Sequence, residues 1–127
     1  MVTLGAGGAY ALAASGAEIT VPAVPADVVD TVGAGDAFAS ALLDGLVREV
    51  PLDAGPAAGL RRMDIPVIRR LLERACVSAA YTCERAGAQS ADARSLFEAV
   101  QRVHRRQRGL TSPDPAAVPP RADTTSL

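Results

Sequence analysis

Residues 29–38 read Val-Asp-Thr-Val-Gly-Ala-Gly-Asp-Ala-Phe, an order that joins a strand to a helix through a glycine turn. A β-branched run precedes the two glycines, and apolar residues with helical spacing follow them. The stretch therefore predicts a strand over about 28–32, a tight turn, and the N-terminus of a helix. Successive backbone N–H groups at such a turn, together with the helix dipole, attract an anion.

Asp36 directly follows the second glycine, so it falls in the first turn of the predicted helix. An anion bound at the turn would repel this carboxylate, which favours a chemical role for it. Accepting the proton of a hydroxyl that attacks phosphorus is such a role. The alternative is a plain packing turn, in which the glycines bring helix and strand close together and Asp36 complements the helix dipole.

Composition excludes several classes of protein. The chain has 127 residues, of which 49% are hydrophobic, and its net charge of −1 offers no basic surface for nucleic acid. All 13 cationic side chains are arginines, so the lysines of P-loop ATPases and protein kinases are absent. No apolar run reaches the roughly 18 residues of a membrane span, and no basic signal-peptide region follows Met1. We expect a cytoplasmic protein.

Periodicity and turn residues predict the remaining elements. We expect short strands over 2–4, 9–13 and 18–21, helices over 34–49, 64–80 and 92–106, and a surface loop over 51–63. The expected buried positions of the first and last helices are Phe38, Ala41, Leu42, Gly45 and Leu46, and Leu96, Phe97, Val100 and Val103.

Two local patterns have simple interpretations. The glycines from Gly5 onward do not complete the dinucleotide fingerprint, because Tyr10 stands where its third glycine would be. Cys76 and Cys83 lie seven residues apart in a helical pattern, so their Cα atoms would be roughly 10 Å apart. A disulfide tolerates about 7 Å, and we therefore expect two reduced thiols.

Residues 30–38, Asp-Thr-Val-Gly-Ala-Gly-Asp-Ala-Phe, resemble the C-terminal signature D-T-[VT]-G-A-G-D-x-F of the ribokinase and fructokinase (phosphofructokinase B-type) carbohydrate kinases. Every specified position of the signature is present. Residues 3–8 are similar to the family's T-L-G-x-x-G segment, and residues 75–88 nearly match its A-x-x-A-A-x-T-C-x-R-x-G-A run. The last run is typical of fructokinases especially and favours fructose as the sugar.

The resemblance implies an α/β fold: the C-terminal portion of a ribokinase-like three-layer sandwich, with a truncated sheet and flanking helices. We expect residues 1–108 to form the C-terminal nucleotide-binding and catalytic part of that domain, and 109–127 to be a disordered, proline-rich tail. The family's members are much longer than this chain. In this interpretation the N-terminal half of the kinase, which supplies most sugar contacts in relatives, is missing.

The resemblance also implies a reaction, phosphoryl transfer from ATP with Mg²⁺ to a sugar hydroxyl. Asp36 corresponds to the family's catalytic base. The backbone at Gly33, Ala34, Gly35 and Asp36 corresponds to its anion hole. The positions that contact the nucleotide in relatives are here Thr3, Gly5, Ala6, Gly7, Gly8, Gly35 and Cys76. Cys76 departs from the family's pattern, because many relatives carry His or Asn there.

Some members of the family hold a monovalent cation such as K⁺. The corresponding positions in this chain are Asp30, Val32, Thr82, Arg85, Gly87 and Ala91. Such a site consists largely of carbonyl oxygens, which a sequence does not display. A rival interpretation from another class is a non-catalytic adenine-nucleotide-binding module, or an inactive remnant, descended from such a kinase. Sugar-dependent release of ADP would distinguish an enzyme from either.

Overall fold

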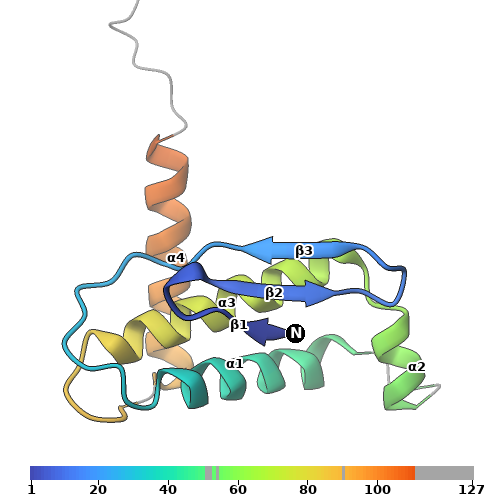
Figure 1. Ribbon diagram of the computed structural model, residues 1–127, viewed down its shortest axis with the longest axis horizontal. Coiled ribbons are helices and arrows are strands. Elements are labelled where there is room, and N and C mark those ends of the chain that lie inside the picture. The colour runs from blue at the N-terminus through green and yellow to red at the C-terminus, as the bar shows by residue number, and fades with distance from the viewer. Residues whose placement is uncertain (51–52, 54, 90, 111–127) are drawn as a thin grey trace, which may run out of the picture.

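The structure is a computed structural model, and it describes residues 1–50, 53, 55–89 and 91–110. Figure 1 shows the order of its elements. They are β1 (Val2–Thr3), the 3₁₀ helix η1 (Gly5–Gly7), β2 (Ala9–Leu12), β3 (Glu18–Val21), α1 (Ala34–Glu49), α2 (Pro56–Arg61), α3 (Ile65–Cys83) and α4 (Ala93–Leu110). The described residues therefore form an α/β structure, as the sequence predicts.

The three strands form one antiparallel sheet in the order β1-β2-β3. Ala11 pairs with Ile19 and Ala9 with Val21, and all four side chains are buried. Their neighbours along the strands are more exposed, because successive side chains of a strand point to opposite faces. One face of the sheet therefore packs against the helices.

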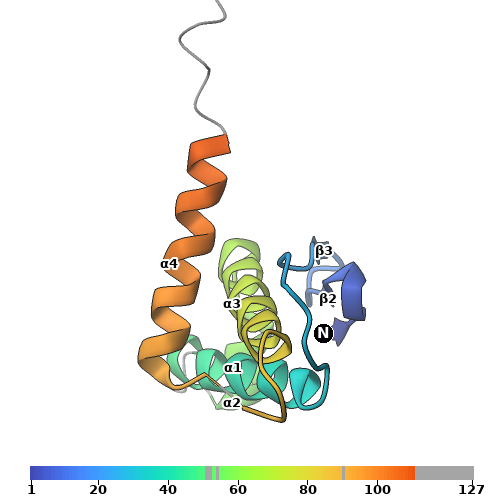
Figure 2. The ribbon, with the colours of Figure 1, turned by 90° about the vertical axis from the view of Figure 1, so that its left-hand side faces the viewer.

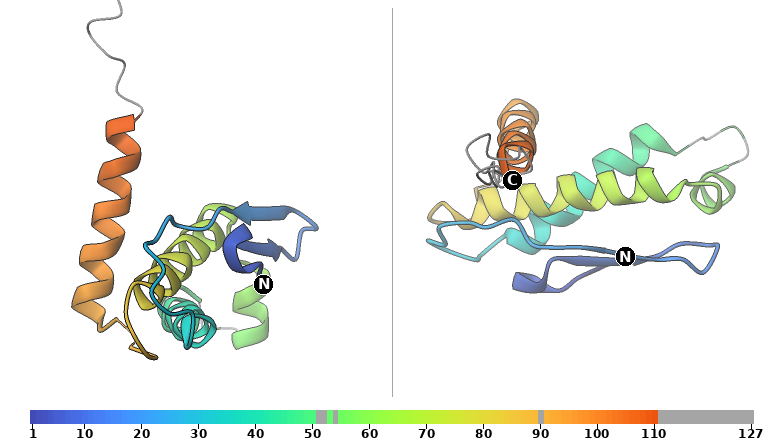
Figure 3. Two further views of the ribbon diagram at one scale, coloured as in Figure 1. Left: turned by 60° about the vertical axis from the view of Figure 1, so that its left-hand side comes forward. Right: turned by 90° about the horizontal axis from the view of Figure 1, so that it is seen from above.

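Helix α3 is the centre of the fold. It packs against β2 and β3, against α1 and against α4. Figure 2 shows α3 between the sheet and α4, with α1 beside it, and Figure 3 shows the strands running along α3. The core gathers around this helix and comprises Ala9, Ala11, Ile19, Val21, Phe38, Ala41, Ile68, Leu72, Ala75, Cys76, Val77, Leu96 and Ala99.

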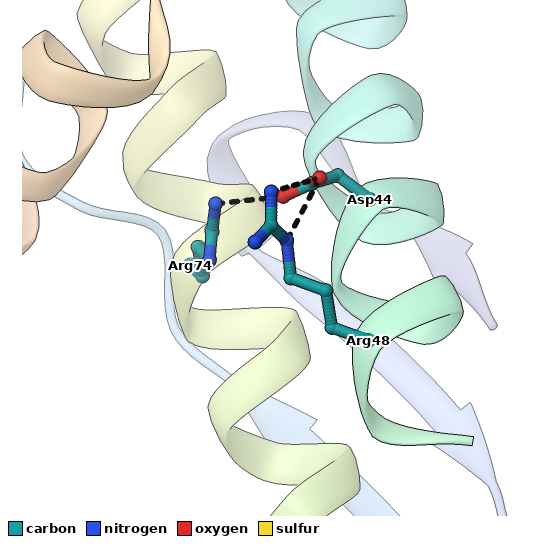
Figure 4. Close-up of polar contacts among 3 residues, drawn as sticks. All are labelled: Asp44, Arg48 and Arg74. Atoms are coloured by element: carbon teal, nitrogen blue, oxygen red, sulfur yellow. Dashed lines mark hydrogen bonds and ion pairs between the residues drawn. The ribbon is translucent and has the colours of Figure 1, made fainter. Parts of the chain in front are cut away.

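Helices α1 and α3 lie side by side and run in opposite directions (Figure 1). Gly45 permits their close approach, because a Cβ at this position would collide with the side chain of Leu71. Asp44 joins the two helices from the surface (Figure 4): its Oδ2 accepts from Arg74 Nη2 at 2.8 Å, and its Oδ1 accepts from Arg48 Nε at 3.0 Å. These partly exposed ion pairs add little stability.

The strand predicted over 28–32 is absent, and this prediction was wrong. The segment is irregular, and the side chains of Val28, Val29 and Val32 are exposed. β-Branched residues form a strand only where a neighbouring strand can pair with them, and none of the described strands does so here. The N–H groups of Val29 and Asp30 instead donate to the Cys83 carbonyl, at 2.8 and 3.1 Å.

Other differences concern the loop at 51–63 and the buried faces of α1 and α4. The predicted loop over 51–63 contains α2, although residues 51–52 and 54 lie outside the described part. Phe97 is 64% exposed, and Leu96 and Ala99 form the buried contact of α4. Leu42 and Leu46 are only half-buried.

Helix α4 runs to Leu110, four residues past the predicted end. The proposed disordered tail therefore overlaps α4 at residues 109–110, and its remainder, 111–127, lies outside the described residues.

Candidate functional site

The turn before α1 has the geometry that the glycine signature predicts. Gly33 is the N-cap of α1 and adopts φ +82°, a left-handed conformation that favours glycine. A Cβ at Gly33 would also lie 2.7 Å from the Cβ of Ala88. The turn therefore packs directly on the loop that follows α3, and glycine is required there for two reasons.

The first turn of α1 leaves backbone donors free. The Ala34 N–H donates to the Thr31 carbonyl at 3.3 Å, and the Ala37 N–H donates to the Gly33 carbonyl at 2.9 Å. Within the described part of the chain, the N–H groups of Gly35 and Asp36 have no acceptor. Free N–H groups at the positive end of a helix dipole form a site that can hold an anion.

Asp30 holds the approach to this turn in place. Its Oδ1 accepts from the Val32 N–H and its Oδ2 from the Gly87 N–H, both at 3.0 Å. These two N–H groups lower the pKa of the Asp30 carboxyl below its ordinary value. One carboxylate therefore connects the segment before α1 to the loop after α3.

Asp36 has a different environment. Its side chain is exposed, and no described residue donates a hydrogen bond to it. It stands one residue after Gly35 at the N-terminus of α1, beside the free N–H groups. An unpaired carboxylate in this place can accept a proton from a hydroxyl that approaches from solvent.

A cleft of about 560 Å³ opens beside the turn. Both glycine turns contribute to it, although they are far apart in the sequence. The predicted nucleotide residues that line it are Thr3, Gly5, Ala6 and Gly8, with Ala34 and Gly35 from α1 and Cys76 from α3. Gly7 does not line the cleft, and the Asp36 side chain lies outside it. The volume falls in the range of pockets for small ligands, about 300–1,000 Å³.

Sequence analysis missed part of this lining. Ala79, Ala80 and Cys83 line the cleft together with Cys76. They follow Cys76 at the i+3, i+4 and i+7 positions, so helical spacing alone could have identified them. Phe38 of α1, Thr31, and part of the segment 23–28 complete the lining. No local pattern marks the segment 23–28, whose place depends on how the sheet is joined to α1.

The structure brings some of the predicted cation positions together. Asp30, Val32 and Gly87 are joined by hydrogen bonds. Thr82 lies next to Gly33, and its hydroxyl donates to the Ser78 carbonyl at 3.1 Å. The side chains of the other two predicted positions, Arg85 and Ala91, make contacts elsewhere.

The Arg85 guanidinium donates to the Tyr81 carbonyl and stacks over the Tyr81 ring, 3.4 Å from its centroid. Ala91 packs against the core. The cation site therefore stays a prediction.

A second cleft, of about 300 Å³, lies along the other face of α3 towards α4. Its lining includes three arginines, two glutamates and His104. The opposite charges largely cancel, so this lining provides no strong field for an anion or a cation.

The described residues contain neither a candidate metal centre nor a membrane-spanning helix. No group of three or more His, Cys, Asp or Glu side chains is placed to hold a metal ion. None of the described helices combines the length and the apolar character needed to cross a membrane. Cys76 and Cys83 are free thiols, as their spacing predicts.

Comparison with known families identifies the chain. The model of the pfkB family carbohydrate kinases matches residues 1–94. The chain belongs to this family. No curated protein and no solved structure gives a match. The matched part of this pfkB chain contains both glycine turns, the cleft and helices α1 to α3, and it ends in the first turn of α4. Membership implies a ribokinase-like fold, to which the small sheet and its helices would contribute a portion.

Proposed function

We propose that this chain is the C-terminal part of an ATP-dependent, fructokinase-like sugar kinase within a ribokinase-like three-layer fold. The observation that carries the proposal is the shared cleft. Residues from the turns at 3–8 and 31–35 line the same 560 Å³ space. The free N–H groups of α1 stand at its edge. Two glycine turns and a helix N-terminus at one cleft favour a phosphorylated ligand.

The nucleotide would lie between η1, the segment 23–28 and α3, because these elements line the cleft. Its phosphates would be held by backbone N–H groups, since a Cβ at Gly35 would meet nothing within 4 Å and the space beside this residue is open. No charged side chain from the described residues lines the cleft. Backbone donors and the dipole of α1 would therefore supply the protein's share of charge stabilisation.

Magnesium fits this cleft only as an ion that arrives with the phosphates. No described carboxylate lines the cleft, and Mg²⁺ at phosphate sites commonly keeps several waters and needs few protein ligands. When bound, it would neutralise charge on the transferring phosphoryl group. The K⁺ site proposed around Asp30 would act indirectly, by stabilising the loop that carries the turn.

Asp36 would accept the proton of the attacking sugar hydroxyl, and the N–H groups at 33–36 would form the anion hole for the transferring group. The exposure of Asp36 is consistent with this role, because the sugar must reach it from outside the cleft. Fructose as the acceptor rests on the resemblance at residues 82–85 alone.

One observation favours the second candidate, a non-catalytic nucleotide-binding module. Asp36 does not line the cleft that would hold the nucleotide. Such a module would bind MgATP without sugar-dependent release of ADP, even when the N-terminal part of a relative is added. An enzyme would release ADP under that condition.

Calorimetric titration of the chain with MgATP and MgADP tests the proposal. We expect weak but saturable binding, because no charged side chain of the described residues lines the cleft. Gly35→Val should abolish the heat by filling the open space, whereas Ser40→Val, an exposed position on the same helix, should leave it unchanged. A folded sample that gives no heat with millimolar MgATP would contradict the proposal.

A further inference from the structure

The cleft is chemically divided. Within the described residues, the side chains that line it and carry a polar atom are Thr3, Thr31, Cys76 and Cys83. Thr3 lies just before the first glycine turn and Thr31 just before the second. The two thiols stand on α3. The hydroxyl groups therefore come from the residues beside the glycine turns, and α3 contributes only thiols and small apolar side chains.

The wall formed by α3 has little capacity for hydrogen bonding. A thiol is a weak donor and a weak acceptor. Cys76 is 5% exposed, and burial together with the nearby Glu73 carboxylate raises the pKa of its thiol, so it stays neutral. Ala79 and Ala80 fill the turn between the two cysteines. This wall can pack against a flat ring but cannot read the polar edge of one.

The segment across the cleft is similarly apolar. Ala23, Val24, Pro25, Ala26 and Val28 contribute to the lining, and Pro25 has no N–H group. Phe38 adds an aromatic ring from α1. The segment 23–28, Phe38 and the α3 wall therefore offer enclosure and ring contacts, which every nucleobase can use alike.

We propose that the cleft selects its ligand by the phosphates and by a flat ring, and accepts nucleoside triphosphates with different bases. This inference rests on the proposed function, because it takes the cleft to be the phosphoryl-donor site. Its physical basis is that polar and apolar binding sites differ in how strongly they reject an analogue of the ligand. A site rejects an analogue strongly when one of its own buried polar groups is left unpaired, and an apolar site discriminates by only about 10–200-fold. No side chain on the α3 wall would be left unpaired by a wrong base.

The test compares the affinities of the 127-residue chain for MgATP, MgGTP and MgCTP, measured by calorimetry under one set of conditions. We expect the three dissociation constants to differ by no more than the roughly 200-fold that an apolar site can supply. A preference for one base beyond about 200-fold would overturn the inference. It would leave the proposed function intact, and would assign base recognition to the backbone of 23–28. Absence of binding for all three nucleotides would overturn both.

Two variants separate the hydroxyl and thiol parts of the lining. Thr31→Val removes a hydroxyl beside the second glycine turn and should weaken the binding of all three nucleotides by the same factor. Cys76→Ala removes a thiol from the α3 wall and should leave the affinity ratios between the nucleotides within about twofold of those of the unmodified chain, because a neutral thiol hydrogen-bonds weakly. A change of more than about tenfold in any ratio with Cys76→Ala would show that this thiol reads the base, and would overturn the inference.

Discussion

At the scale of the residue, two aspartates six positions apart have opposite environments. Asp30 accepts two backbone hydrogen bonds and connects two loops. Asp36 accepts none from the described residues and faces solvent. A carboxylate whose oxygens are both engaged maintains structure, whereas a free carboxylate beside an anion site is available for proton transfer. Substitution of Asp36 should therefore lower activity, whereas substitution of Asp30 should lower stability.

Asp36→Asn keeps the size of the side chain and removes the base. In a kinase reconstituted from this chain and the N-terminal part of a pfkB relative, we expect kcat to fall by about 10²–10⁴-fold, with little change in the KM for MgATP. Asp27→Asn, an exposed carboxyl before the turn, is the control and should keep full activity. Steady-state kinetics measures both. An Asp36→Asn enzyme with half the original activity would reduce Asp36 to a dipole-complementing residue.

Asp30 should make the thermal stability depend on pH. Because its pKa is lowered in the folded state, the stabilisation is complete above its ordinary value of 3.8 and is lost as the pH falls through the lowered folded value. Asp30→Asn should therefore lower Tm at pH 7, and the difference from the unmodified chain should shrink below pH 3.8. Circular dichroism melts at several pH values measure this. A difference in Tm that stays constant down to pH 2 would show that the charge of the Asp30 carboxylate does not stabilise the fold.

At the scale of the element, the site depends on how the N-terminus of α1 meets the loop after α3. Gly33 packs against Ala88, and the Cys83 carbonyl accepts from Val29 and Asp30. The C-terminal end of α3 thus positions the segment that leads into α1. The proposed anion site would therefore depend on this junction as much as on the glycine signature.

Gly33→Ala tests the junction. A left-handed backbone costs a non-glycine residue about 1–2 kcal/mol, and the new Cβ would also press on Ala88, which lies 2.7 Å away. We expect a clear fall in the free energy of unfolding, measured by urea titration, and partial rescue by Ala88→Gly in a double-mutant cycle.

Gly35→Ala is the matched control for this cycle, because a Cβ there meets no atom within 4 Å and its φ is not positive. It should leave the free energy of unfolding unchanged or slightly raised, since alanine favours a helix. If Gly33→Ala and Gly35→Ala lowered the free energy of unfolding equally, the proposed role of the contact between Gly33 and Ala88 would be wrong.

At the scale of the whole molecule, the described residues offer groups suited to one reactant of the proposed phosphoryl transfer and not to both. The cleft has apolar walls and free backbone donors, but its lining includes no carboxylate or amide side chain that could hold a sugar, and the sequence contains no asparagine. Phosphoryl transfer relies on positioning both reactants. The outer face of α1 also exposes large apolar side chains, with Val47 73% and Leu43 61% exposed, a surface that further structure could cover.

We therefore expect the 127-residue chain alone to leave sugars unphosphorylated. A sugar hydroxyl that is not bound loses the rate advantage of positioning, an effective molarity of about 10⁵ M or more. This loss in rate exceeds the rate gain that an anion hole contributes. A coupled ADP-release assay with fructose, ribose and glucose measures this, first on the chain and then after addition of the N-terminal part of a pfkB relative. Robust turnover by the chain alone would overturn the expectation, and turnover only after addition would support it.

Local chemistry determined much of this protein from the sequence. The helix over 34–49 and the strand over 18–21 have the predicted bounds, because helical spacing, turn residues and a proline act over a few residues. The glycine turn before that helix is also present, with Gly33 as the N-cap of α1. The signature at 30–38 likewise pointed to the pfkB family before any contact was known.

Tertiary structure decided what depends on distant partners. The β-branched run at 28–32 found no strand beside it and bonded to the end of α3 instead. Phe97 turned outward because the contact of α4 with the core is made by Leu96 and Ala99. The cleft formed because antiparallel pairing placed the turn at 5–8 near the C-terminal half of α3. Each of these outcomes is set by the free energy of contacts between elements, which no short stretch of sequence contains.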